Sequence, residues 1–428
     1  MTHFGAICPT HFTGHLNTML PLAQELKRRS HRVTFIGIVG YEAKIRAAGL
    51  EFISYGQEEF PQGAMTEYLD HLSQLSGIPA FRYSVVGILK KDANALLQET
   101  PQLIKDAGID ALLIDSASIG GVAIADFLKI PFITIHSIVV SHQENNIPPL
   151  FTNWKYNPAW WAKLRNKFEY RRFQPWIKPL IEVVSKYRAQ WNLPLQPQPD
   201  TPNYQLAEIS QQPALLEFPR ENLPEWFHFT GPYHYSGTRE PVPFPWDKLT
   251  GKPLIYASLG SLVNRFFDVF YKIAAACEGL DAQLVISLGG STTLESLPNL
   301  PGNPLVVKYA PQLELLQKAA LTITHAGMNT TLESLNNGVP MVAIPIAFDQ
   351  PGVAARIAWS GVGEIIPLKR LTVPRLRRAI SKVLTQPSYK QNALRLQEAI
   401  NRAGGVTRAA DIIERGVSTG KPVLTGTI

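Results

Sequence analysis

The chain has 428 residues, 45% of them hydrophobic and 18% charged, and a formal net charge of +7. At about 150 residues per domain, this length predicts two or three globular domains. The composition excludes a disordered acidic chain, and the 30 Gly and 34 Pro residues follow no period, which excludes a collagen-like repeat.

Short apolar runs alternate with helical patterns through the first half of the chain. The spacing of apolar residues predicts strands at 3–8, 32–38, 50–55, 111–115 and 131–136 and helices at 15–29, 41–48 and 120–128. Strands that alternate with helices form parallel sheets with helices on both faces. Residues 1–235 are therefore predicted to fold as a doubly wound α/β domain.

A proline-rich stretch follows this first unit. Residues 231–248 contain four prolines, which is typical of an interdomain linker, and we place the linker at 236–250. Residues 251–405 repeat the alternation and are predicted to form a second α/β domain that faces the first across a cleft. Its strands are expected at 254–258, 283–289, 305–310, 321–325 and 340–346, and its helices near 265–278 and 330–337. We expect the C-terminal segment 406–428, which begins with a helix, to pack back on the first domain.

The number of cysteines and the character of the N-terminus indicate the cellular compartment of the protein. Cys8 and Cys277 are too few for a disulfide framework or a CxxC metal site, and we expect both to be buried. The N-terminus has no basic region followed by an apolar one, and no apolar run reaches the roughly 18 residues of a membrane span. These features predict a cytoplasmic protein.

The positive charge is concentrated between residues 151 and 191. This segment holds nine Lys and Arg residues against two Glu, and five of the eight Trp residues. Two interpretations stay open: a patch that makes peripheral contact with a membrane surface, or a solvated helical insertion whose aromatic residues pack on their own domain. A nucleic-acid partner is not expected, because no other part of the chain has the features of a nucleic-acid module.

His15 and Asp115 are the candidate catalytic pair. His15 follows the first strand at the start of a helix, and Asp115 ends a later strand, so both fall on the carboxyl edge of one parallel sheet. A histidine that acts as a base needs an acid partner to fix its tautomer and stabilise the imidazolium. His11 is the competing candidate for the base, and its alternative role is that of a loop residue.

The stretch HAGMNTTLESLNNGVPMVAIPIAFDQ at 325–350 is polar where a strand ends and a helix begins. The unpaired N–H groups and positive dipole at a helix N-terminus can hold a phosphate, and Gly327 permits close backbone approach. Ser261 follows another strand, at the sheet edge where ligands bind. In the alternative interpretation, Thr330 and Glu333 form a capping box and are structural. A GxGxxG motif is absent, so a dinucleotide is not indicated.

Together with YAPQLELL at 309–316, this stretch resembles the signature of the family 1 UDP-glycosyltransferases. The resemblance implies a GT-B fold of two Rossmann-like domains, a UDP-sugar donor, and His15 and Asp115 as the base and its partner. Tyr309 takes the place of the aromatic residue, usually Trp, that stacks on uracil. The other implied donor contacts are Gln312 with the uracil edge, Glu333 with the ribose, Ser261, His325, Gly327, Asn329 and Thr330 with the diphosphate, and Asp349 and Gln350 with the sugar hydroxyls.

Further stretches at 1–9, 207–220, 347–358 and 409–426 resemble the bacterial zeaxanthin glucosyltransferases within that family. This resemblance implies an inverting transfer of glucose from UDP-glucose to a lipophilic hydroxylated acceptor such as a carotenoid. The acceptor is expected beside five residues of the first domain, Phe60, Met65, Phe81, Tyr83 and His136. Neither a metal nor another cofactor is expected, because the sequence has no Asp-x-Asp of the metal-binding type and no His-x₃-His.

Three other functions stay open at this point. The first is a glucosyltransferase with a broad range of flavonoid, phenol or sterol acceptors. The second is a nucleotide-sugar binding protein without catalysis, which the presence of both His15 and Asp115 disfavours. The third is a nucleotide-sugar epimerase, which would form product without any acceptor.

Overall fold

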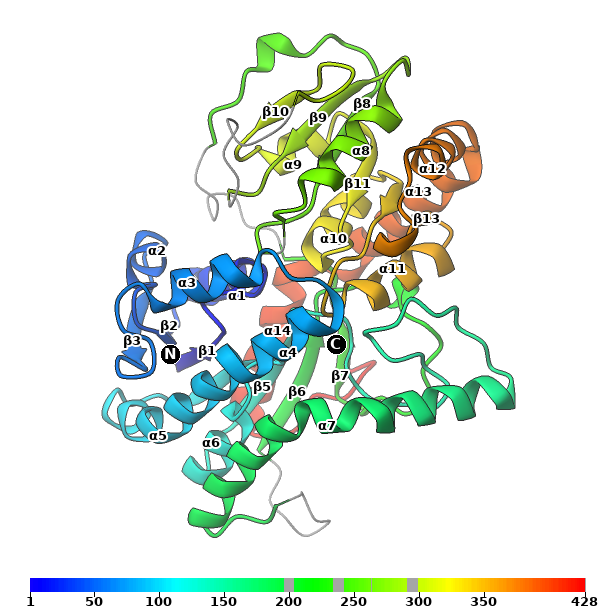
Figure 1. The fold of residues 1–428 in the computed structure, drawn as a ribbon. Helices are drawn as coiled ribbons and strands as arrows, with labels where there is room; N and C mark the ends of the chain where they lie inside the picture. Colours follow the sequence, from blue (N-terminus) through cyan, green and yellow to red (C-terminus); the bar gives the residue numbers. More distant parts are fainter. Residues whose placement is uncertain (196–203, 234–241, 263, 291–298, 428) are drawn as a thin grey trace.

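The computed structural model describes residues 1–195, 204–233, 242–262, 264–290 and 299–427. The linker predicted at 236–250 is described only from residue 242, and its first part lies outside the described residues. Within the described residues, two parallel β-sheets form the framework, one in each half of the chain (Figure 1). The predicted class, two doubly wound α/β domains, is confirmed.

The described strands of the two sheets follow doubly wound orders. The first sheet has the order β3-β2-β1-β4-β5-β6-β7 and the second the order β10-β9-β8-β11-β12-β13. The first consists of β1 (His3–Ile7), β2 (Arg32–Ile38), β3 (Glu51–Tyr55), β4 (Ala111–Asp115), β5 (Phe132–His136), β6 (Gln205–Ser210) and β7 (Phe227–Phe229). The second consists of β8 (Leu254–Ser258), β9 (Gln283–Ser287), β10 (Leu305–Val307), β11 (Ala319–Thr324), β12 (Met341–Ala343) and β13 (Gly363–Ile365).

Helices cover both faces of each sheet. In the first domain α1 and α14 lie on one face and α5, α6 and α7 on the other; in the second, α8 and α12 lie opposite α10 and α11 (Figure 1). Because both faces are covered, every residue of β1, β4, β5 and β8 is buried. The α-helices are α1 (Thr13–Arg28), α2 (Glu42–Ala47), α3 (Ala64–Leu72), α4 (Gly77–Tyr83), α5 (Lys90–Asp106), α6 (Gly121–Leu128), α7 (Trp160–Gln190), α8 (Phe267–Cys277), α9 (Gln312–Leu316), α10 (Met328–Asn336), α11 (Gln350–Trp359), α12 (Val373–Thr385), α13 (Pro387–Ala403) and α14 (Gly405–Thr419).

The strand order of each sheet reverses next to its first strand. β1 lies between β2 and β4, and β8 lies between β9 and β11. At such a switch point the loops at the carboxyl edge diverge, and a ligand can enter between them. His15 follows β1 and Ser261 follows β8, so each domain places a candidate site residue at its switch point.

The chain returns to the first domain at its C-terminal end. It turns between α13 and α14 at Gly404 and Gly405, which both have positive φ. α14 then packs against α1, and the Arg29 guanidinium pairs with Asp411 at 2.6 Å and with Glu414 at 2.7 Å. The last helix is therefore a structural part of the first domain.

Three of the predicted strands are shorter than expected by two residues or more, and the first of them, predicted at 283–289, ends at Ser287. The strand predicted at 340–346 ends at Ala343, because Pro345 has no amide N–H to donate to a neighbouring strand. The strand predicted at 305–310 ends at Val307. None of the described helices combines the length and apolar character that crossing a membrane requires.

Candidate active site

The side chains of His15 and Asp115 meet at the carboxyl edge of the first sheet. His15 lies in the first turn of α1, just after β1, and Asp115 is the last residue of β4. The Nδ1 atom of His15 lies 3.0 Å from both carboxylate oxygens of Asp115. The two residues of the predicted pair, which are 100 positions apart in the chain, are therefore in direct contact.

Ser137 is a third member of this group, and the sequence pattern did not single it out. Its hydroxyl donates to Oδ2 of Asp115 at 2.7 Å and lies 2.7 Å from Nδ1 of His15. The backbone N–H of Ala117 donates to Oδ1 of Asp115 at 2.8 Å, so the fully buried carboxylate is well supplied with hydrogen bonds. Ser137 directly follows the strand predicted at 131–136. Its place at the carboxyl end of a strand was the one feature of the sequence that could have marked it as a candidate site residue.

These contacts determine which nitrogen of His15 carries the proton. Nδ1 faces a carboxylate and is therefore protonated, which leaves Nε2 as an acceptor. Burial alone would lower the pKa of His15, but the charge and hydrogen bond of Asp115 outweigh burial and raise the pKa above 6.5. In its neutral form, His15 can take a proton from a hydroxyl group through Nε2.

His11, the competing base, lies in a different environment. Its ring is buried and packs at a tilt against the ring of Phe12, with the ring centroids 4.1 Å apart. Burial lowers the pKa of His11 to about 3, and within the described chain neither ring nitrogen has a hydrogen-bond partner. Of the two candidate bases, only His15 has an acid partner.

In the second domain, three of the residues assigned to the donor converge. Nε2 of Gln312 donates to Oε2 of Glu333 at 2.5 Å and lies 3.4 Å from Oγ1 of Thr330. The hydroxyl of Tyr256, on β8, donates to Oε1 of Gln312 at 3.0 Å. The sequence predicted the strand at 254–258, but it did not assign Tyr256 to this group.

The capping-box interpretation of Thr330 and Glu333 is wrong. α10 starts at Met328, and its N-cap is Gly327, so Thr330 lies inside the first turn rather than at the cap. Glu333 lies a full turn too late to return a hydrogen bond to that cap, and it accepts one from Gln312 instead.

His325 lies between two glycine turns at the end of β11. A Cβ atom at Gly260 would come within 2.6 Å of Nε2 of His325, and one at Gly327 within 2.4 Å, so the two turns can close on the ring only as glycines. Ala326 has a φ of 63°, an uncommon backbone conformation that marks this turn as strained. Burial lowers the pKa of His325 to about 4, so the ring is neutral rather than positively charged near neutral pH.

Ser261 and Tyr309 lie at the outer part of this region. Ser261 is exposed at the turn that follows β8. The ring of Tyr309 is 51% exposed, and its hydroxyl occupies the space beside Gly290, where a Cβ would come within 1.8 Å. The exposed ring leaves apolar surface on which a planar base can stack.

Asn329, the second residue of α10, links the two domains. Its Nδ2 donates to the carbonyl oxygen of Gly14 at 2.8 Å, and its Oδ1 accepts a hydrogen bond from Nε2 of Gln211 at 2.9 Å. Gln211, which directly follows β6, also lies 2.9 Å from the carbonyl oxygen of Ser137. One hydrogen-bond network thus connects the start of α10 to the neighbourhood of His15.

Asp349 and Gln350 lie side by side in the chain but make different contacts. Oδ2 of Asp349 accepts a hydrogen bond from the backbone N–H of Val139 in the first domain at 3.2 Å, and burial raises the pKa of this carboxyl. Oε1 of Gln350 accepts the backbone N–H groups of Ile346 and Ala347, each at 2.9 Å. Gln350 therefore stabilises the turn before α11 through Oε1, and Nε2 is the atom of this side chain that could bind a sugar hydroxyl.

The residues expected around the acceptor lie on several different segments of the first domain. Phe60 and Met65 are buried in the core of the first domain. Phe81 and Tyr83 belong to α4, and the ring of Phe81 packs against Phe173 of α7 with centroids 4.8 Å apart. Phe60 and Met65 thus belong to the core of the domain, and the expectation that they lie beside the acceptor stays a prediction.

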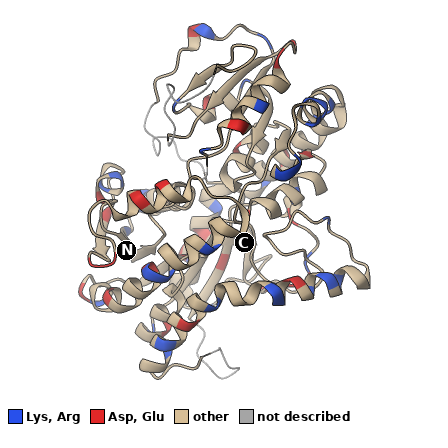
Figure 2. Ribbon diagram, in the orientation of Figure 1, with Lys and Arg blue, Asp and Glu red and all other residues tan. Residues whose placement is uncertain are grey.

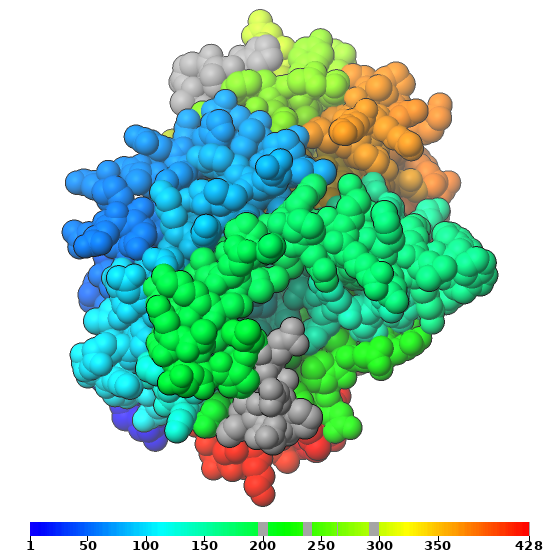
Figure 3. All heavy atoms as spheres, turned by 60° about the horizontal axis from the view of Figure 1, so that its bottom comes forward, coloured from blue at the N-terminus to red at the C-terminus, as the bar shows by residue number. Residues whose placement is uncertain are grey.

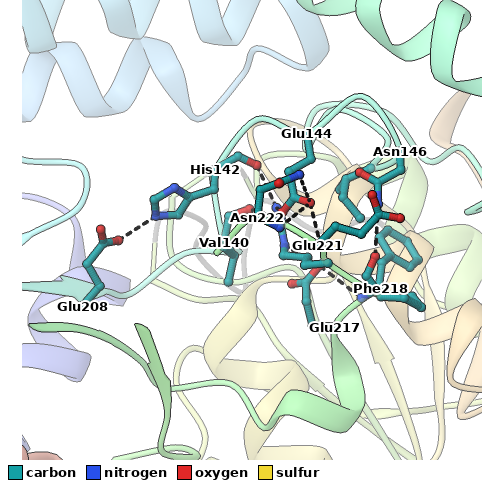
Figure 4. Close-up of polar contacts among 12 residues, drawn as sticks. Val140, His142, Glu144, Asn146, Glu208, Glu217, Phe218, Glu221 and Asn222 are labelled. Atoms are coloured by element: carbon teal, nitrogen blue, oxygen red, sulfur yellow. Dashed lines mark hydrogen bonds and ion pairs between the residues drawn. The ribbon is translucent and has the colours of Figure 1, made fainter. Parts of the chain in front are cut away.

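His136 belongs to a group that could hold a metal ion. His136, His142 and Glu208 offer ligand atoms that lie within 4.8 Å of one another, and two imidazoles with one carboxylate suit zinc. Both imidazoles already hydrogen-bond to Oε2 of Glu208, at 2.9 and 2.6 Å, and the second contact is drawn in Figure 4. Burial would raise the pKa of Glu208, but these two hydrogen bonds lower it to about 2. The hydrogen bonds account for the convergence of the three side chains.

A buried network of charges joins the domains beside this group. Glu144 accepts the backbone N–H of Glu221 at 2.9 Å (Figure 4) and pairs with Arg220 at 3.2 Å. Glu217 pairs with Arg220 at 3.3 Å and also with Arg356, a buried residue of α11 in the second domain. Removing one partner of such a buried pair is costly, so the network holds the two domains together.

Comparison with known proteins agrees with this architecture. A family profile described as "UDP-glucoronosyl and UDP-glucosyl transferase" matches residues 39–402. The zeaxanthin glucosyltransferase of Pantoea ananas is 33% identical, over 100% of this chain and 98% of that protein. The zeaxanthin glucosyltransferase of Pseudescherichia vulneris is 28% identical, over 99% of this chain and 100% of that protein.

A solved structure gives the same result for the fold. The crystal structure of the glycotransferase of kitacinnamycin superposes with a TM-score of 0.73 at 25% identity and covers 97% of this chain and 98% of its own. Since the family profile spans most of the sequence and two similar relatives match it nearly from end to end, the chain belongs to the UDP-glucuronosyl and UDP-glucosyl transferase family, a family of enzymes with the GT-B fold.

Proposed function

We propose that this enzyme transfers glucose from UDP-glucose to a hydroxyl group of a carotenoid such as zeaxanthin, with inversion at C1 of the sugar. The observation that carries the proposal is the contact between His15 and Asp115, 3.0 Å long, at the switch point of the first sheet. It is the arrangement of a general base with its supporting acid.

The proposed reaction is a single displacement. Nε2 of His15 takes the proton of the acceptor hydroxyl, and the oxygen attacks C1 of glucose as the bond from C1 to the UDP oxygen breaks. Asp115 stabilises the imidazolium that forms. Because the attacking oxygen and the leaving UDP lie on opposite sides of C1, the configuration at C1 inverts.

The donor is proposed to bind along the carboxyl edge of the second sheet. Tyr309 would stack on uracil, Gln312 would bind its edge, and Glu333 would accept from the ribose hydroxyls. Ser261, His325, Gly327, Asn329 and Thr330 would surround the diphosphate at the start of α10, where backbone N–H groups are unpaired. Asp349 and the Nε2 group of Gln350 would bind the sugar hydroxyls. We propose that no metal takes part, because these groups can carry the charge of the diphosphate.

The carotenoid acceptor is supported by the two zeaxanthin glucosyltransferases among the relatives. The test is incubation of the purified enzyme with UDP-glucose and zeaxanthin dispersed in detergent, with detection of the glucoside by mass and of UDP by its release. A glucoside of inverted configuration is the expected result. Transfer to phenols or sterols but not to zeaxanthin would favour the broad-acceptor alternative.

Two controls separate the other classes of function. Conversion of the nucleotide sugar without any acceptor would identify an epimerase. Binding of UDP-glucose with no turnover on zeaxanthin, phenols or sterols would identify a binding protein and contradict the proposal.

A further inference from the structure

The N-terminal half of α7 presents large apolar side chains to solvent. Trp160, Trp161, Leu164 and Phe168 are 74, 48, 57 and 67% exposed. Positions 160, 164 and 168 are four residues apart, so they form one stripe along the helix. This stripe, with Trp161 beside it, is more than the scattered apolar residues found on the surface of most soluble proteins.

The other tryptophans of this region are packed, so the exposed pair is distinct. Trp191 stacks on Phe127 with centroids 4.4 Å apart, Trp176 contacts Phe173 at 5.4 Å, and the Arg165 guanidinium covers Trp154 at 4.2 Å. Packing on the protein itself therefore explains Trp154, Trp176 and Trp191. It does not explain the exposed stripe.

A basic stripe runs beside the apolar one. Lys163, Lys167 and Arg171 recur every four residues, and Figure 2 colours basic positions blue along this part of the α7 ribbon. In the part of the chain that the structure describes, the ion pairs of α7 use Arg172, Lys178 and Arg188. Lys163, Lys167 and Arg171 thus make no ion pair with any acid in the described parts of the chain.

This end of α7 projects from the molecule. Its first turns extend away from both sheets in Figure 1, and the same region protrudes at the right of the space-filling view in Figure 3. The inner side of the helix is held in place, because Nδ2 of Asn166 donates to the carbonyl oxygen of Asn145 at 3.0 Å and the hydroxyl of Tyr170 donates to that of Ile147 at 3.2 Å. The exposed stripe is therefore presented on an anchored helix.

We infer that this face, defined by Trp160, Trp161, Leu164 and Phe168 with Lys163, Lys167 and Arg171, docks on an anionic lipid bilayer. Trp and Phe insert at the boundary between head groups and acyl chains, and Lys and Arg bind anionic head groups. The helix lies on the membrane and does not cross it, in accord with the lack of a membrane-spanning helix among the described residues. A symmetric contact between two copies is disfavoured, because it would bring the two basic stripes together.

The position of the face also suits delivery of a lipophilic acceptor, and this step rests on the proposed function. Phe173, farther along α7, stacks on Phe151 with centroids 3.8 Å apart and contacts Phe81 of α4 at 4.8 Å. A row of aromatic rings therefore leads from the docking helix toward the body of the first domain. Membrane docking through the first turns of α7 brings the helix that carries Phe173 to the phase in which a carotenoid dissolves.

The test is sedimentation of the full chain, without acceptor or UDP-glucose, with vesicles of phosphatidylcholine and phosphatidylglycerol. We expect binding at low salt and release at 1 M salt, where the Debye length falls to about 3 Å. Trp160→Ser with Phe168→Ser should reduce the partition coefficient roughly tenfold or more. Lys167→Gln with Arg171→Gln should reduce it about fivefold for each charge removed, and vesicles of phosphatidylcholine alone should bind weakly.

Matched controls lie on the same helix. Ile181, which is 52% exposed, and Lys186 belong to the C-terminal half of α7, beyond the two prolines at 175 and 179. Ile181→Ser with Lys186→Gln should leave vesicle binding unchanged, and a thermal melt of each variant checks its folding. Equal losses in the control and in the variants of the docking face would overturn the inference.

Two further outcomes contradict the inference without affecting the proposed function. The wild-type protein could fail to sediment with anionic vesicles at low salt. Alternatively, analytical ultracentrifugation could show a dimer that Trp160→Ser with Phe168→Ser dissociates, which would make the face a contact between copies. Conversely, vesicle binding without turnover of detergent-dispersed zeaxanthin would contradict the proposed function and leave the docking face in place.

Discussion

The side-chain amide of Asn329 donates a hydrogen bond to the carbonyl oxygen of Gly14, at 2.8 Å. Asn329 lies in the first turn of α10, where the diphosphate is proposed to bind, and Gly14 directly precedes His15. The contact therefore joins the proposed donor site of one domain to the proposed base of the other. Its two partners are 315 positions apart in the chain.

Replacement of His15 by Ala should abolish transfer and leave UDP binding intact. The proposed base lies in the first domain and the proposed nucleotide site in the second. The substitution should therefore change the rate of transfer without changing the affinity for UDP. Loss of a general base costs about 10²–10⁴ in rate. Measurements of kcat and of UDP affinity by calorimetry check this, with His71→Ala as a control at an exposed position of the same domain. A His15→Ala enzyme that keeps more than about a tenth of kcat would show that His15 is not the base.

The pH profile of kcat/KM should report the pKa of His15. Asp115 raises that pKa above 6.5, and the base acts only when it is neutral. Activity should therefore fall as the pH drops through a value above 6.5. In Asp115→Asn the charge that favours the imidazolium is gone, so the acid limb should move to lower pH while the maximal rate also drops. An acid limb that stays in place in Asp115→Asn would mean that another group titrates.

Replacement of Glu333 by Ala should weaken UDP binding. The ribose hydroxyls would lose a charged acceptor, which is worth about 1.5–3 kcal/mol, and Gln312 would lose one of its hydrogen-bond partners. The measurement is the rise in Tm that saturating UDP produces, which should shrink in the variant. Ser334→Ala is the matched control on α10, because this hydroxyl bonds to Thr322 and to the carbonyl oxygen of Thr330, both within the fold. It should lower Tm but keep the rise with UDP.

Replacement of Gly327 by Ala tests the close packing around His325. The backbone of Gly327 has a φ of −66°, which alanine adopts freely, so the only obstacle is the 2.4 Å contact of the new Cβ with Nε2 of His325. Overpacking of this kind costs about 1–3 kcal/mol in the free energy of unfolding. Adding His325→Ala should recover most of that loss, as a denaturation series on the two single variants and the double variant would reveal. Purely additive losses would contradict the steric explanation.

Chelation of divalent metals should leave the rate of transfer unchanged. The unpaired N–H groups at the start of α10 and the side chains beside them are proposed to neutralise the diphosphate without a cation. Initial rates with and without EDTA, and after readdition of magnesium or manganese, check this. A rate that falls with EDTA and returns with metal would disprove metal-independent transfer.

Local patterns predicted the elements that carry the site. Strands such as 111–115 and 254–258 are short, apolar and buried on both faces, so the pattern gives their bounds directly. The pairing of His15 with Asp115 follows from parallel topology, because the carboxyl ends of parallel strands share one edge. The capping-box interpretation failed because it depended on the first residue of α10, and helix ends are the least certain part of such a pattern.

Contacts between distant segments could not be read from the sequence. Ser137 and Gln211 each follow a strand, but nothing in their surroundings shows that they reach Asp115 and Asn329. The meeting of His136, His142 and Glu208 depends on the pairing of β5 with β6, which brings together His136 and Glu208 although they are 72 positions apart in the chain. Which tryptophans between 151 and 191 are packed and which are exposed depends on how α7 sits on the domain.

The return of α14 to the first domain has a consequence for how the molecule moves and is made. The second domain is in effect an insert, joined to the first by two chain crossings, one after residue 233 and one at Gly404 and Gly405. Because an inserted domain is attached at both of its ends, it cannot rotate freely about a single connection. During synthesis, α1 cannot pack against α14 until α14 has left the ribosome. The first domain is therefore completed only after the second has been made.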